Sequence, residues 1–165
     1  MDSGIISVGM HLEGQMALSA LLLLVCAAGF VVLLALTGWR LLAYWDAVVD
    51  DFTDPRRAFG FFTFIAGTNV LDVRLAMDGF HTATAVLLAV AGALWLVLGY
   101  VIPWTAVLGR RERPVVVAAN GTWFIAVVAS QSVAIAAATL EPLGEIWRRE
   151  LALVAVFSWS VGIFF

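Results

Sequence analysis

Three long stretches of this chain contain no Asp, Glu, Lys, Arg or His: residues 16–39, 82–109 and 114–140. About 20 apolar residues are enough for a helix to cross the ~30 Å hydrocarbon layer of a bilayer, and each stretch is longer. Inside a bilayer the backbone must satisfy its own hydrogen bonds, which leaves helices or closed β-barrels, and barrel strands are half as long and alternate in polarity. The sequence therefore predicts an all-α integral membrane protein.

The composition points the same way. Of the 165 residues 63% are hydrophobic and only 13% are charged, whereas soluble domains are about half apolar and a quarter charged. The net charge of −3 indicates no particular partner, and the basic residues, all arginine, form no contiguous face of the kind that nucleic-acid binding requires. Cys26 stands alone in an apolar run and is interpreted as a small packing residue.

The pattern predicts a single, partial transmembrane domain over residues 1–165, with six helical segments joined by polar loops. These segments are about 3–10 (a stub), 16–39, 59–77, 82–104, 114–140 and 151–165 (truncated). Because the helices at both ends look incomplete, we expect either a fragment or a half-protein that completes itself with a partner.

Arginine counting predicts the topology. Loops 40–58 and 105–114 hold six arginines, and the loops on the opposite side hold three. The positive-inside rule places the first set in the cytoplasm, so we expect a multi-pass protein of the cell membrane (plasma or inner) with these two loops cytoplasmic.

Two of the spans carry polar residues at membrane depth, and such residues face a bundle interior or a watery path. On 59–77, a stripe at helical spacing holds Arg56, Gly60, Thr63, Gly67 and Arg74; on 114–140, one face holds Asn120, Phe124, Val127, Gln131, Ala134 and Ala138. These stripes fit a pore wall, but small and hydroxyl residues on one face also serve helix packing. Residue pattern alone leaves both interpretations open.

Three charged residues near the stripe on 59–77 are candidates for a role with anions. Arg56 and Arg74 stand where they can raise the local anion concentration, although Arg74 can also extend along its helix to the membrane surface, which we slightly prefer. Asp72 lies opposite the arginine stripe and is interpreted as either a paired packing residue or a proton-sensitive group. His11 and His81 sit at loop ends, and no catalytic or metal-binding constellation is recognisable, so we expect no enzyme activity.

Several long stretches carry a family resemblance. They are Asp54–Ala76 (DPRRAFGFFTFIAGTNVLDVRLA), Gly99–Trp104 (GYVIPW), Asn120–Phe124 (NGTWF) with Ala129–Ser132 (ASQS), and Phe157–Ser160 (FSWS). Together they resemble the tellurite-resistance/C4-dicarboxylate transporter family, which includes plant slow anion channels and yeast malate permeases.

The resemblance implies ten helices arranged as five hairpins around a central pore, with odd-numbered helices inside. This chain then covers about the first half, 59–77 and 114–140 become pore-lining helices, and the alternation of plain and polar spans is explained. On that basis we expect Thr63, Gly67, Asn120, Phe124 and Gln131 to line the pore. The gating phenylalanine of the family lies on helix nine, which this chain does not include, and Asp72 stands where a small residue is expected. No cofactor is implied, and family members are often homotrimers.

The function expected from the sequence is transport of small anions: a C4-dicarboxylate, a tellurite-type oxyanion or an inorganic anion. A proton-coupled carrier that uses Asp72 is a second interpretation. A membrane assembly or scaffold subunit without transport is the third, in which the polar stripes pack against partner helices.

Overall fold

The computed structural model describes residues 2–54, 56–108, 121–143 and 146–164, and these residues are helical apart from short turns. The helices are α1 (Asp2–Leu12), α2 (Met16–Ala43), α3 (Trp45–Thr53), α4 (Phe62–Met77), α5 (His81–Leu108), α6 (Phe124–Leu140) and α7 (Arg148–Phe164), with 3₁₀ turns η1 (Ala58–Phe61), η3 (Gly121–Trp123) and η4 (Glu141–Leu143). Among the described residues, four segments are long and apolar enough to cross a membrane: Met16–Ala43, Ala58–Met77, His81–Thr105 and Phe124–Leu143. The predicted all-α membrane fold is confirmed.

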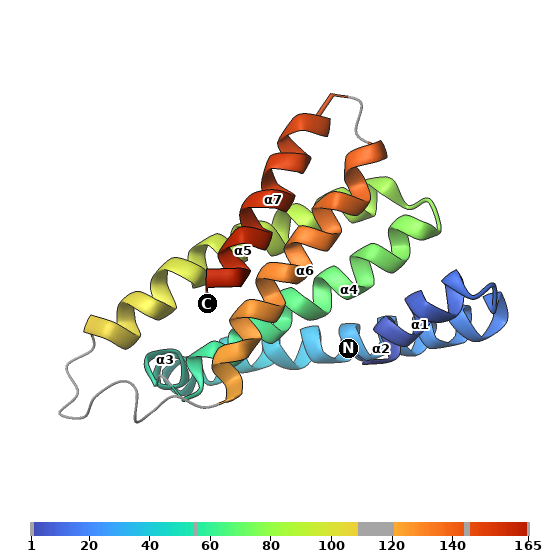
Figure 1. Ribbon diagram of the computed structural model, residues 1–165. Helices are drawn as coiled ribbons and strands as arrows, with labels where there is room; N and C mark the ends of the chain where they lie inside the picture. Colours follow the sequence, from blue (N-terminus) through green and yellow to red (C-terminus); the bar gives the residue numbers. More distant parts are fainter. Residues whose placement is uncertain (1, 55, 109–120, 144–145, 165) are drawn as a thin grey trace.

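The chain is built from consecutive helical hairpins, α1–α2, α4–α5 and α6–α7 (Figure 1). Gly14 and Gly79 close the first two hairpins with positive φ angles of 76° and 84°, which glycine adopts without steric cost. In both turns the glycine N–H donates to the carbonyl three residues back and the next N–H donates five residues back, to Met10 and Leu75. This Schellman arrangement satisfies the last carbonyls of α1 and α4, so the chain reverses its direction within a few residues at both turns.

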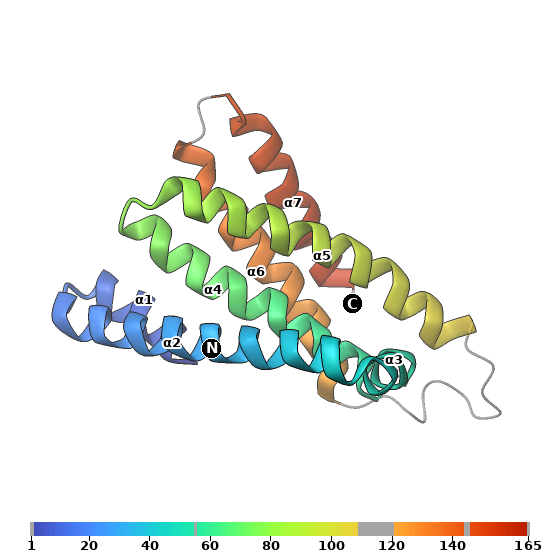
Figure 2. The same cartoon turned by 180° about the vertical axis from the view of Figure 1, so that it is seen from behind.

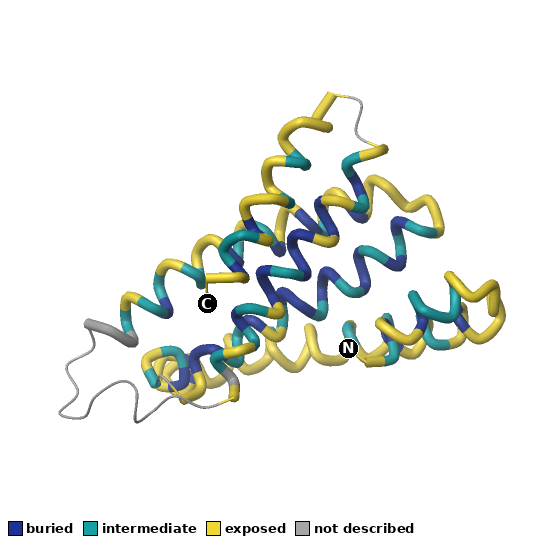
Figure 3. The backbone as a smooth tube through the Cα atoms, in the orientation of Figure 1, coloured by how far each residue is buried: buried dark blue, intermediate teal, exposed yellow. Residues whose placement is uncertain are grey.

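The centre of the bundle is α4, which packs against α6 on one side, α5 behind, and α1 and α2 on the other side (Figures 1 and 2). Burial follows this order: 56% of the most apolar window of Ala58–Met77 is buried and 50% of Phe124–Leu143, against 22% of His81–Thr105 and 6% of Met16–Ala43. Figure 3 shows the buried residues concentrated on α4 and α6. The two spans with polar residues are therefore the inner ones, as the sequence predicted.

The apolar core lies where α4, α5 and α6 meet. Phe59, Phe62 and Ile65 pack there with Trp95 of α5 and the alanines of α6, and the small alanines let α6 approach closely. The Trp95 indole N–H donates to Ser130 Oγ at 2.9 Å, which satisfies the polar atoms of both side chains inside the bundle.

Several helix bounds differ from the sequence expectation: α5 ends at Leu108 instead of near residue 104, and α7 begins at Arg148 instead of near residue 151. The segment 40–58, expected to be a loop, contains the helix α3, and α2 continues to Ala43 instead of ending near Trp39. The helix α3 buries Val48 and Asp51, three residues apart, on one face. Three of its nine residues are acidic, so a search for apolar membrane spans does not detect this short amphipathic helix.

Candidate functional site

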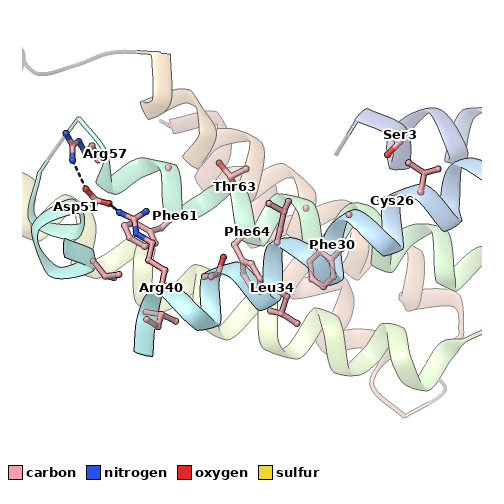
Figure 4. A pocket seen from close by; sticks show the side chains of 18 residues that line it. Ser3, Cys26, Phe30, Leu34, Arg40, Asp51, Arg57, Phe61, Thr63 and Phe64 are labelled. Carbon is pink, nitrogen blue, oxygen red and sulfur yellow. Dashed lines mark hydrogen bonds and ion pairs between the residues drawn. The ribbon is translucent and has the colours of Figure 1, made fainter. Parts of the chain in front are cut away.

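A cavity of about 650 Å³ lies between α2 and α4 (Figure 4). Its walls are mostly apolar and are formed by one stripe of each helix, with α1 at one end and α3 and the turn before η1 at the other. The lining residues are Ser3, Val25, Cys26, Gly29, Phe30, Leu33, Leu34, Thr37, Arg40, Leu41, Val48, Asp51, Arg57, Gly60, Phe61, Thr63, Phe64 and Gly67. From Cys26 to Arg40 the cavity follows α2 for roughly 21 Å, at 1.5 Å per residue.

Charged residues gather at one end of this cavity. Arg40 from the last turns of α2 and Arg57 from the segment before η1 both form ion pairs with Asp51 of α3. The Arg57–Asp51 pair joins Nη1 to Oδ1 at 2.8 Å. The acid is largely covered, with a side chain 12% exposed, whereas the arginine side chains are 54% and 69% exposed. We call Arg40, Asp51 and Arg57 the charged triad.

The electrostatics of the triad keep Asp51 ionised. The hydrogen bond from Arg57 holds the pKa of the Asp51 carboxyl below its ordinary value of 3.8; burial opposes this, and the positive charge of Arg40 adds to it. The triad thus contains two positive charges and one negative charge at neutral pH. Asp54 also acts electrostatically on Arg57, and its Oδ1 accepts the backbone N–H of Arg56 at 3.0 Å.

Of the five residues expected to line a pore, the structure brings Thr63 and Gly67 to this cavity, beside Gly60. Phe124 and Gln131 lie on α6 instead: Phe124 is 71% exposed, and Gln131 Nε2 donates to the Trp159 carbonyl of α7 at 3.3 Å. Asn120 lies outside the described residues. Among the arginines, Arg40 and Arg57 line the cavity, and Arg56 lies on the exposed turn next to it.

Arg74 has a different environment from the one expected. Its side chain is 3% exposed, and its Nε lies 3.2 Å from Ser7 Oγ of α1 and 3.1 Å from Ser19 Oγ of α2. Its Nη1 forms an ion pair with Asp78 at 2.6 Å. The guanidinium therefore ends inside a contact of three helices and does not extend to the membrane surface as preferred from the sequence. This geometry favours a structural role over anion attraction.

Asp72 is fully buried on the opposite side of α4, towards α5 and α6. Thr84 of α5 donates to its backbone carbonyl at 3.5 Å, and one turn earlier Asn69 Nδ2 donates to Ser132 Oγ of α6 at 3.0 Å. Within the described part of the chain, both carboxyl oxygens of Asp72 and Oδ1 of Asn69 have no hydrogen-bond partner. Ionisable residues at membrane depth are expensive, which makes this cluster a candidate functional feature.

Comparison with known proteins assigns the chain to a family. A family model described as voltage-dependent anion channel matches residues 1–165, the whole sequence. The chain belongs to the voltage-dependent anion channel family. The resemblance to the tellurite-resistance/dicarboxylate transporter family is thereby confirmed. No curated protein and no solved structure matches this chain significantly.

Family membership supports anion transport as the general function and a multi-pass position in a membrane. The family consists of channels and transporters and not of enzymes. An anion channel needs a route through the bundle and a field that attracts anions. The cavity between α2 and α4, with arginines at one end, is a candidate for part of such a route.

The residues that sequence reasoning missed are Arg40, Asp51, Arg57 and Thr37. Arg40 lies on α2, Asp51 on α3 and Arg57 in the turn before η1, and helical spacing does not reveal how these separate segments fold against one another. One signal was present: Phe30, Leu33, Thr37 and Arg40 recur at helical spacing on α2, so Arg40 ends a stripe that also faces the cavity.

Proposed function

We propose that this chain moves small anions across the membrane, and that its substrates belong to the class of C4-dicarboxylates, tellurite-type oxyanions or inorganic anions. The observation that carries the proposal is the match of the anion channel family over all 165 residues. Selection in this proposal comes from the width of the route, a weakly positive field and a few polar side chains, without tight binding.

The proposed route runs along the polar stripe of α4, which faces the cavity between α2 and α4. Small residues at Gly60 and Gly67 leave space, and Thr63 and Thr37 supply hydroxyl groups that can replace part of the hydration of an anion. Trp39, Tyr44 and Trp45 are 60–67% exposed at the same end as Arg40, and tryptophan and tyrosine are typical of the membrane–water interface. With the arginine-rich loops in the cytoplasm, this end is the cytoplasmic mouth.

The test is anion uptake into liposomes that contain the purified protein. We expect uptake of chloride or succinate above that of empty liposomes, and Gly67→Trp should abolish most of it by filling the cavity. Gly38→Trp is the matched control, because Gly38 is also a helical glycine with open space around its Cβ position but lies off the cavity lining. Equal loss in both variants, or uptake that survives Gly67→Trp, would remove this cavity from the route.

A scaffold subunit without transport is the competing function. Single cysteines at Thr63 and Gln131, placed in a Cys26→Ala background, distinguish the two. Reaction of the Thr63 cysteine with a membrane-impermeant thiol reagent supports a watery route. Protection of both positions, together with absent uptake, supports the scaffold.

A proton-coupled carrier is a second candidate because the Asp72 carboxyl is fully buried and without a hydrogen-bond partner in the described structure. Under this mechanism a proton gradient drives anion uptake, and Asp72→Asn abolishes the dependence on the gradient while passive flux remains. Uptake by the unmodified protein that does not change with the pH gradient would eliminate this candidate.

A further inference from the structure

Three oxygen atoms buried on α4 have no hydrogen-bond partner among the described residues: both carboxyl oxygens of Asp72 and Oδ1 of Asn69. The two residues are 0% and 1% exposed. They stand three positions apart on the helix, on the face that meets α5 and α6, so their Cβ atoms are neighbours at about 5–6 Å. All three atoms are acceptors when Asp72 is ionised, and acceptors cannot satisfy one another.

Ser132 of α6 fixes the orientation of the Asn69 amide. The Ser132 hydroxyl donates its single hydrogen to the Ala129 carbonyl at 2.7 Å, so it can only accept from Asn69. Asn69 Nδ2 accordingly donates to Ser132 Oγ at 3.0 Å. The amide oxygen Oδ1 therefore points away from Ser132 as an acceptor that still requires a donor.

The missing donor must be small. None of the three oxygens has surface that a water molecule could touch, so the packing leaves no room beside them for a water molecule or a bound cation. Thr84 of α5 also lies against Asp72, but its hydroxyl donates to backbone carbonyls, that of Phe80 at 3.1 Å and that of Asp72 at 3.5 Å. A proton on the Asp72 carboxyl is the donor that this packing allows.

The charges around Asp72 favour the same state. Arg74 is two positions further along α4, but its guanidinium ends between α1 and α2 and pairs with Asp78. The titratable side chains of the described α5, His81 and Tyr100, are both exposed, and the described α6 has none. An unpaired carboxylate within a membrane-spanning bundle is expensive, whereas the neutral acid carries no charge and supplies one O–H donor.

We propose that Asp72 is a neutral carboxylic acid in the folded protein and donates its O–H hydrogen to Asn69 Oδ1. A chain of donors then runs from Asp72 through Asn69 and Ser132 to the Ala129 carbonyl, and it joins the two inner helices α4 and α6. The assignment follows from the packing of these helices and does not depend on transport. A neutral acid also adds no negative charge to the helix beside the proposed anion route, and this consequence alone rests on the proposed function.

Infrared spectroscopy of the purified protein detects the proton directly. At pH 7 we expect the C=O band of a protonated carboxylic acid, which Asp72→Asn should remove and which Asp46→Asn, at an exposed acid of α3, should leave unchanged. Asn69→Leu removes the acceptor, so the band should remain but move to the higher frequency of an acid without a hydrogen bond. Absence of the band, or a band that Asp72→Asn does not change, would overturn the inference; a band that Asn69→Leu does not move would reject Asn69 as the acceptor.

Melting temperatures of two variants test the donor independently. Asp72→Asn retains an N–H donor for Asn69 Oδ1, so its melting temperature at pH 7 should stay within about 2 °C of the unmodified protein. Asp72→Leu has a similar volume but no donor and leaves Oδ1 buried and unpaired, so its melting temperature should fall by at least about 2–4 °C. If Asp72 were ionised and unpaired, both variants would remove a buried charge and raise the melting temperature together, which would overturn the inference.

The bound proton also makes stability depend on pH. An aspartate in the unfolded chain is ionised above about pH 4, so unfolding at neutral pH releases the proton, and a higher pH favours the unfolded state. We expect the melting temperature of the unmodified protein to fall relative to that of Asp72→Asn by about 3–5 °C per pH unit between about pH 5 and pH 8. His11 and His81 titrate in both proteins, so the comparison removes their effect. A difference between the two melting temperatures that stays constant over this range would overturn the inference.

Discussion

Replacing Arg74 by Met tests whether its contact with α1 and α2 stabilises the bundle. Met fills a similar space but donates no hydrogen bonds. Hydrogen bonds between membrane helices average about 0.6 kcal/mol and reach about 1.7 kcal/mol, and a partly exposed ion pair adds up to about 1 kcal/mol. Arg74 shares its single Nε–H between the two serine hydroxyl oxygens and pairs with Asp78, whose side chain is 30% exposed. We therefore expect a loss of about 1–3 kcal/mol in the free energy of unfolding.

The loss should not exceed this range, because the substitution leaves no serine without a partner. Ser7 Oγ donates to the Ser19 carbonyl and Ser19 Oγ donates to the Ser7 carbonyl, each at 2.7 Å, so these two bonds remain after Arg74 is removed. Asp78, being partly exposed, can exchange the guanidinium for water. The penalty for an unpaired buried charge is therefore avoided.

The assay is reversible unfolding of the purified chain in mixed detergent, followed by circular dichroism. A double-mutant cycle with Ser19→Ala should give a coupling energy of about 0.6–1.7 kcal/mol. Arg149→Met is the control for loss of a positive charge. An unfolding free energy of Arg74→Met within 0.5 kcal/mol of the unmodified protein would refute the structural role, and a raised half-saturating anion concentration without destabilisation would restore the role in anion attraction.

Two further predictions concern other contacts. Because the pKa of Asp51 is lowered in the folded protein, its ion pairs add stability that is present above about pH 3.8 and is lost as the pH falls further. The melting temperatures of the unmodified chain and of Asp51→Asn should therefore differ at pH 7 and converge below pH 3.8. At Gly162, a Cβ atom would lie 2.5 Å from Gln131 Nε2 and 3.2 Å from Ser130 Cβ. Gly162→Leu should therefore separate α7 from α6 and lower the free energy of unfolding by about 1–3 kcal/mol. Gly99→Leu, where the Cβ position has open space, should not lower it.

The order of inner and outer helices could be predicted from the sequence, because a polar side chain in a membrane-spanning helix is stable only where protein or water surrounds it. Thr68, Asn69 and Asp72 on α4 are buried, as their cost in lipid requires, and the almost wholly apolar α2 is the most exposed span. The helix α3 could not be predicted in this way, because it lies outside the apolar spans. Its burial of Asp51 depends on two arginines that are 11 and 6 residues away in the sequence.

The polar stripe of α4 was predicted as one surface, but the structure divides it. Gly60, Thr63 and Gly67 face the cavity towards α2, whereas Arg74 is enclosed by α1 because Ser7 and Ser19 provide acceptors at that height. Helical spacing places residues on a common face, yet it does not reveal how far along the helix each neighbour extends. Here α1 covers only the first part of α2, so the same stripe is packed at one end and open at the other (Figure 1).

The sequence and the structure favour different neighbouring residues, Arg56 and Arg57, as the arginine that attracts anions. Sequence spacing selects Arg56 as the residue that attracts anions, whereas the structure places Arg57 on the cavity lining and in contact with Asp51. Both variants to Gln remove one charge from the same loop, so they change the long-range field almost equally, and that field is weakened by salt. Only Arg57→Gln removes donors from the mouth of the cavity. We therefore expect the half-saturating succinate concentration to rise several-fold more in Arg57→Gln than in Arg56→Gln. The difference between the two variants should persist when the salt concentration is raised to about 0.5 M with a salt whose anion is not transported. An equal or larger effect of Arg56→Gln would mean that the charge of the loop, and not the geometry of the triad, attracts the anion.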